Sequence, residues 1–135
     1  DSRIPKLVTS LQIGGQPWHP VYSPDGKFVY FPQRTSNSVA VVDSQTWELV
    51  ASIEGNGLAE PHGSAISADG GTLWVSGRNT EAIYPTTIES TSSADASGEG
   101  LPAGTVVAID TLSRQIVAVL EVPVYAAGIG TRPSY

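Results

Sequence analysis

Two histidines, His19 and His62, are the side chains of this 135-residue sequence that are best suited to bind a metal. Each lies just after a Trp or a Pro and just before a short apolar run. Neutral imidazole is a good ligand for copper, zinc and haem iron, so the pair is a candidate metal or haem site. Two ligands are too few to complete a metal centre. The alternative is that each histidine caps a strand by hydrogen-bonding a backbone carbonyl.

Two arginines, Arg34 and Arg78, end similar apolar runs downstream of these histidines. A guanidinium binds carboxylates and phosphates through paired N–H groups, so both arginines are candidate ligand-binding residues. The alternative is that they anchor loops by donating to carbonyls or carboxylates of the chain itself.

Other kinds of chemistry find little support in the sequence. It has no Cys, which excludes disulfides, thiolate metal sites and a Cys nucleophile. Ser64 lies near His62, but no Gly-x-Ser-x-Gly elbow surrounds it and no orienting acid is identified, so we assign no catalytic residue. The net charge of -6, without a basic cluster, argues against a nucleic-acid partner. No apolar run is long enough to cross a membrane.

The histidines and arginines recur because the sequence itself repeats. SPDGKFVYFPQRT (23–35) aligns without gaps on SADGGTLWVSGRN (67–79), at an offset of 44 residues. VVDSQTWELVASIE (41–54) aligns on AIDTLSRQIVAVLE (108–121), at an offset of 67. The additional residues fall in the segment 81–104, which we interpret as a loop insertion.

The alignment divides the chain into two complete units, 16–57 and 58–125, between two partial ones. Residues 6–15 match the end of the first unit and are predicted to be the last strand of a preceding unit. Residues 126–135 are predicted to begin a following unit. The strands predicted in the first complete unit are His19–Ser23, Lys27–Pro32, Ser38–Asp43 and Glu48–Glu54.

Four acidic residues are interpreted as turn residues and not as a catalytic pair. Asp25 and Asp69 precede glycines in tight hairpin turns, where Gly supplies the positive φ. Asp43 and Asp110 begin the next turns, where a short carboxylate can accept backbone N–H groups.

Four short antiparallel strands every 40-odd residues, apolar on both faces, are typical of a β-propeller blade. We therefore predict an all-β fold, a propeller segment of two four-stranded blades with partial blades at both ends. A β-sandwich is the alternative, but it does not explain the fixed period. In a propeller the first strand of each blade lines the central channel. Strand direction then places both histidines, both arginines and the insertion at one end of the molecule, with the histidines nearest the axis.

The stretch SPDGKFVYF followed by SNSVAVVDSQTWELVASIEGNG resembles the YVTN-type β-propeller repeat. This resemblance implies an extracytoplasmic protein, that is periplasmic, secreted or on the cell surface, as surface-layer proteins are. EPHGSAISADGGTLWVSGR is similar to a segment of nitrous oxide reductase propellers, in which such a histidine is a copper ligand. SNSVAVVDS is similar to the d1-haem propeller of nitrite reductases. The present sequence differs from both families in having two histidines and no cytochrome or cupredoxin part.

Two functions follow as hypotheses. The first is a non-enzymatic binding or assembly module whose partners are other propeller blades or subunits. The second is the propeller portion of a periplasmic redox enzyme that holds copper or haem and takes part in electron transfer. The sequence contains no Met, so we expect a processed product or part of a longer chain.

Overall fold

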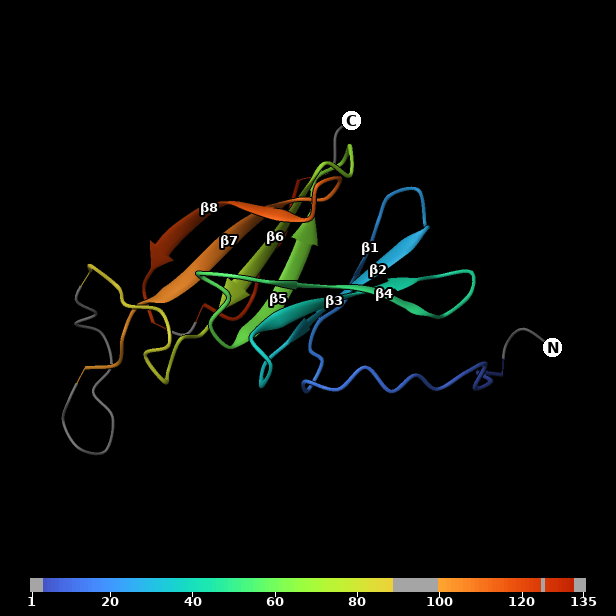
Figure 1. Ribbon diagram of the computed structural model, residues 1–135, viewed down its shortest axis with the longest axis horizontal. Coiled ribbons are helices and arrows are strands. Elements are labelled where there is room, and N and C mark those ends of the chain that lie inside the picture. Colours follow the sequence, from blue (N-terminus) through green and yellow to red (C-terminus); the bar gives the residue numbers. More distant parts are fainter. Residues whose placement is uncertain (1–3, 89–99, 125, 133–135) are drawn as a thin grey trace.

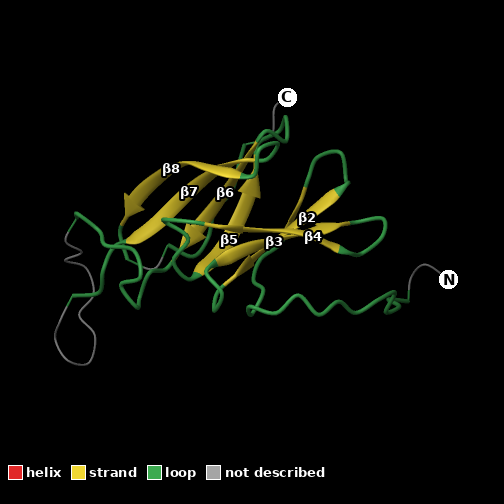
Figure 2. Ribbon diagram, viewed as in Figure 1, coloured by secondary structure: helices red, strands yellow, loops and turns green. Residues whose placement is uncertain are grey.

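The protein forms two four-stranded antiparallel sheets, seen in a computed structural model that describes residues 4–88, 100–124 and 126–132 (Figures 1 and 2). In each sheet the strands are hydrogen-bonded in the order in which they occur in the chain. The first sheet contains β1 (Val21–Tyr22), β2 (Phe28–Gln33), β3 (Ser38–Asp43) and β4 (Leu49–Glu54). The second contains β5 (Pro61–Ile66), β6 (Thr72–Gly77), β7 (Gly104–Asp110) and β8 (Gln115–Val122).

This architecture confirms the predicted all-β propeller segment of two blades. The repeat extends to irregular details of the sheets. The pairing of the third and fourth strands shifts register between Val41 and Val42, and again between Ala108 and Ile109, which are the aligned positions. The sequence repeat is therefore a repeat of three-dimensional structure.

The first strand of the first blade is shorter than predicted. The prediction was His19–Ser23, whereas β1 contains Val21 and Tyr22 alone. Pairing with β2 begins at an isolated bridge between Pro17 and Gln33, but Pro20 has no N–H to donate, and the regular ladder starts only at Val21. In the second blade the corresponding strand, β5, is six residues long.

The Asp-Gly turns form as predicted. The Ser23 hydroxyl donates to the Asp25 carboxylate over 2.6 Å, and Ser67 donates to Asp69 over 2.5 Å in the second blade. The glycine after each aspartate, Gly26 or Gly70, has a φ of 72° or 75°. Together with the backbone N–H groups that the same carboxylates accept, these hydrogen bonds lower the pKa of both aspartates.

The turns between the third and fourth strands follow the same logic. The Asp43 carboxylate accepts the backbone N–H groups of Gln45 (2.8 Å) and Thr46 (2.9 Å). The Asp110 carboxylate accepts both the N–H and the hydroxyl of Ser113. The interpretation of all four aspartates as turn residues is thus confirmed.

The hydrophobic core lies between the two blades. Tyr30, Val39 and Val41 of the first sheet form one buried cluster with Leu73 and Val107 of the second. The inner strand β5 is the strand of the second sheet that packs against β1 and β2 (Figure 1). Burial on both faces explains why the middle strands carry apolar residues on both faces.

Residues 4–14 run outside both sheets and extend away from them (Figure 1). Their apolar side chains are largely exposed, with Leu7 at 81% and Val8 at 84%. The assignment of residues 6–15 to a preceding blade stays a prediction. Within the described part of the chain, no helix is long and apolar enough to span a membrane.

Candidate functional site

His62 lies at the start of β5 with 5% of its surface exposed, and both of its ring nitrogens have partners. Nδ1 lies 3.0 Å from the carbonyl oxygen of Ala127, and Nε2 lies 2.9 Å from Nη2 of Arg78. A guanidinium can only donate, so Nε2 accepts from Arg78. The proton of the neutral ring is therefore on Nδ1 and is donated to the carbonyl. The expectation that a histidine hydrogen-bonds a backbone carbonyl holds for His62.

Two aromatic rings from the first blade pack against this histidine. The Trp18 ring stacks on His62 with centroids 4.6 Å apart, and the His19 ring lies 4.8 Å from His62 at a steeper angle. The Arg78 guanidinium lies 5.9 Å from the Trp18 ring centroid, within cation–π range. We call Trp18, His19, His62 and Arg78 the His62 cluster. It joins the inner edges of both blades.

The surroundings of His62 favour its neutral form. Burial lowers its pKa from the ordinary value, and the positive charges of Arg78, His19 and Arg34 lower it further. The hydrogen bond to the Ala127 carbonyl acts in the opposite direction but is outweighed. A neutral ring at pH 7 is what the acceptor role of Nε2 requires.

A cavity of about 410 Å³ lies beside the cluster, lined by His19, His62, Gly63, Ser64 and residues 127–129. The Ser64 hydroxyl donates to the backbone carbonyl of His19 over 2.6 Å, and so fixes the two inner strands to each other. Both predicted histidines therefore border one cavity.

The side chains around His62 do not fit a copper or haem site as they stand. Its Nε2 lone pair is occupied by Arg78, so a metal ion there would have to displace the guanidinium. The described residues also contain no group of three or more His, Cys, Asp or Glu that could hold a metal ion. Assignment of His19 and His62 as metal ligands stays a prediction.

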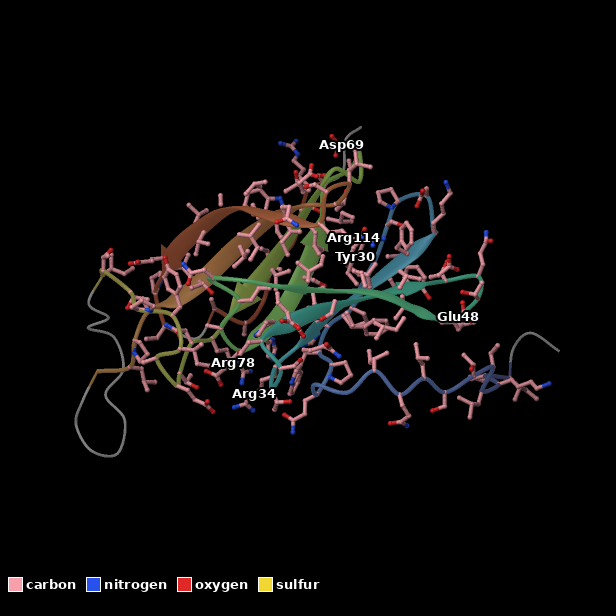
Figure 3. The ribbon with its side chains drawn as sticks, viewed as in Figure 1. Tyr30, Arg34, Glu48, Asp69, Arg78 and Arg114 are labelled. Carbon is pink, nitrogen blue, oxygen red and sulfur yellow. The ribbon has the colours of Figure 1, made fainter. Side chains whose placement is uncertain are left out.

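Arg34 does not join the His62 cluster, although it lies at the same end of the molecule as Arg78 (Figure 3). Its Nη2 and Nε lie 3.2 and 3.4 Å from one carboxylate oxygen of Glu60. The two residues border a separate hollow of about 260 Å³, together with Glu81 and Ile83 from the start of the insertion. This pairing is the anchoring role that the sequence left open for the arginines.

Glu60 is the site residue that the sequence analysis missed. Only 2% of the surface of Glu60 is exposed. The second oxygen of its carboxylate accepts hydrogen bonds from the backbone N–H and the hydroxyl of Thr80 and from the backbone N–H of Glu81. Burial raises the pKa of this carboxyl, but hydrogen bonds from Thr80, Arg34 and Glu81 outweigh it and lower the pKa overall. A single acidic residue within the apolar run Gly57–Pro61 was the signal available in the sequence.

The insertion is fastened at its base by two side chains. The buried Asn79 amide donates to the carbonyls of Tyr84 and Ala103, both over 2.9 Å, and accepts the N–H of Tyr84. Glu121 of β8 accepts from Thr87. Residues 89–99 of the insertion lie outside the described part of the chain.

Comparison with known proteins supports the fold. No protein-family model and no curated protein matches the sequence. Kuenenia stuttgartiensis hydrazine synthase has a similar structure at 22% identity, with a TM-score of 0.65 over 96% of this chain and 30% of that chain. The structure of U3-55K is also similar, at 15% identity and with a TM-score of 0.57; the similarity covers 95% of this chain and 33% of U3-55K. Pyrococcus horikoshii acylaminoacyl peptidase is similar at 20% identity, with a TM-score of 0.55. The similarity covers 80% of this chain and 18% of the peptidase chain.

At these identities the similarity concerns the fold alone. The chain spans about a third or less of the length of each of these structures. It is therefore similar to one segment of each, which agrees with two blades of a β-propeller.

Proposed function

We propose that this chain is a binding and assembly segment of an extracytoplasmic, YVTN-type β-propeller, and that it acts within a larger propeller or complex. The observation that carries the proposal is the His62 cluster. Two adjacent blades bring together a stacked Trp–His pair, a second imidazole and a guanidinium, and the two imidazoles border one open cavity. Clustered aromatic and arginine side chains of this kind are typical of binding hot spots.

The outer surfaces of the two blades support a role in assembly. Tyr30 of β2 is 3% exposed because the second blade covers it. Trp74 occupies the aligned position in β6 but is only half-buried, and it does not belong to the buried cluster. A further blade against β6 would cover Trp74 as the second blade covers Tyr30, and propellers consist of about 4–8 such blades.

The test is the mass of the purified chain in solution, measured by light scattering, with near-ultraviolet circular dichroism to report packed aromatic side chains. We expect the 135 residues to associate, or to show packed tertiary structure only with further blades attached. A monodisperse, fully packed monomer of 14.1 kDa would contradict the proposal.

The alternative is the propeller portion of a periplasmic redox enzyme with copper or haem. The rings of His19 and His62, whose centroids are 4.8 Å apart beside a cavity, favour this redox function. The hydrogen bonds on both ring nitrogens of His62 oppose it. Metal analysis and an optical spectrum of the purified protein separate the two functions. Stoichiometric copper or a haem absorption band would favour the redox enzyme.

A further inference from the structure

Arg34 and Arg78 occupy the same position in the two blades, yet their guanidinium groups have different partners. Each residue directly follows the second strand of its blade, and each donates its backbone N–H to the residue aligned 18 positions before it, Gln16 or Glu60. Arg34 directs its Nε and Nη2 edge to a carboxylate. The matching edge of Arg78 meets His62 through Nη2, and its Nε is buried with no hydrogen-bond partner.

The carboxylate that neutralises Arg34 comes from the following blade, since Glu60 begins the second unit. At the 67-residue offset that aligns the ends of the two units, the residue corresponding to Glu60 is Ala127. Its carbonyl lies against His62, the direct neighbour of Arg78, but its side chain is a methyl group. In the described parts of the chain, no carboxylate lies within 4.0 Å of Arg78.

The charge around Arg78 is therefore locally positive in a protein of net charge -6. Its neighbours in the His62 cluster are two imidazoles and an indole, which offer no negative charge. A buried N–H donor without an acceptor is unfavourable, and a carboxylate is the acceptor that matches a guanidinium edge. Trp18 and His19 are exposed, so the cluster reaches the surface on their side, whereas Nε of Arg78 itself is buried.

We propose that Arg78 is the centre of a binding site for a carboxylate that this segment does not itself supply, with His19 and Trp18 at its entrance. The inference deepens the proposed binding function and rests on the same site. A small organic acid or an Asp or Glu side chain of a partner subunit would provide the same chemistry.

The test titrates sodium acetate into the protein in its native assembly, with labelled histidines observed by NMR and ionic strength held constant with chloride. Inorganic phosphate serves as the comparison anion. We expect a saturable shift of the His19 and His62 resonances with acetate. Arg78→Gln should weaken binding at least tenfold, whereas the matched variant Arg34→Gln should change it less than twofold. Should Arg78→Gln fail to fold, Arg78→Lys retains the charge, lacks the paired N–H groups and is expected to bind more weakly than wild type.

The source of the carboxylate is decided by where acetate binds. Saturation in the intact assembly indicates a small acid. If acetate binding saturates only after the assembly has been dissociated, and the Arg78→Gln protein associates at least tenfold more weakly, the carboxylate comes from a side chain of a partner subunit. The proposal is overturned if acetate shifts neither histidine in either state, or if the two arginine variants behave alike. A folded monomer that still binds acetate would refute the assembly function and leave the carboxylate site standing.

Discussion

At the scale of single residues, His62 links three parts of the molecule through one neutral ring. It accepts from Arg78, donates to Ala127 and stacks on Trp18. Protonation of Nε2 would replace the hydrogen bond to Arg78 with repulsion between two cations. The ring therefore resists protonation in the folded state, and its pKa is lowered.

This linkage predicts how stability depends on pH. Unfolded His62 takes up a proton as pH falls through its ordinary pKa of 6.5, whereas the folded ring does so only at lower pH. The free energy of unfolding should therefore decrease as pH falls through this window, by at most about 1.4 kcal/mol per pH unit for one proton. Urea unfolding at pH 7.5 and 5.5 should show a smaller decrease for His62→Gln than for wild type. A decrease of equal size in both proteins would exclude His62 as its origin.

Among the carboxylates in the described residues, Glu60 is predicted to contribute most to the free energy of unfolding. Glu60→Gln removes the ion pair with Arg34 and weakens the hydrogen bonds to Thr80, so we expect a loss of about 1–3 kcal/mol in the free energy of unfolding. Because its pKa is lowered from 4.5, this contribution is complete above pH 4.5 and is lost as pH falls through the lower folded value. Thermal unfolding at pH 7 measures the loss. Glu81→Gln is the control, since Glu81 binds Glu60 through its backbone N–H, which the substitution retains; equal effects of the two variants would disprove the role of Glu60.

At the scale of strands and turns, much of the structure could be predicted from the sequence. β3 was predicted with its observed bounds, and β2 and β4 to within one residue, because the alternating turns and apolar runs repeat. β1 was predicted too long, because Pro20 interrupts the pairing within the predicted range His19–Ser23.

The candidate site was predicted less completely than the strands. Strand direction placed the two histidines and Arg78 together, but it could not distinguish Arg78 from Arg34. That difference depends on Glu60, which lies in a quoted motif but was given no role, and on Ala127, which lies outside the aligned segments. Hydrogen-bond partners contributed by distant loops leave no periodic signal in a single sequence.

Gly77, at the end of β6, is predicted to require a hydrogen side chain. A Cβ there would lie 2.5 Å from the carbonyl oxygen of Ala59 and 2.5 Å from the Thr105 hydroxyl, and the backbone cannot easily move away. Gly77→Ala should lower the free energy of unfolding by about 1–3 kcal/mol through overpacking. The matched control is Gly128→Ala, because no atom lies within 4 Å of a Cβ at that position. Chemical denaturation of both variants measures the difference, and equal stability would contradict the predicted clash.

At the scale of the whole molecule, two blades bury one interface and leave two outer faces. Tyr30 and Trp74 illustrate the difference between the interface and an outer face, since they are aligned in the repeat but differ in burial. The first belongs to the core between the blades, and the second lies outside that core and is predicted to face a following blade.

Substitution of these two aromatic residues should therefore have different effects, on stability for Tyr30 and on association for Trp74. Tyr30→Ala should lower the free energy of unfolding by about 3–5 kcal/mol, as large-to-small substitutions of buried aromatic residues do. Trp74→Ala should leave the two blades folded and weaken their association with further blades or subunits at least tenfold. Denaturation and analytical ultracentrifugation measure the two effects. If Trp74→Ala associates normally, the outer face of β6 does not contact a following blade.

The Asn79 amide has a practical consequence for engineering this protein. By binding Tyr84 and Ala103 at once, it closes the base of the insertion independently of what lies between them. The insertion is thus a suitable grafting point. A peptide epitope or a small reporter domain could replace residues 89–99 without altering the register of β6 with β7. Such a chimaera should retain the circular dichroism of the parent, whereas the same graft in an Asn79→Ala background should not.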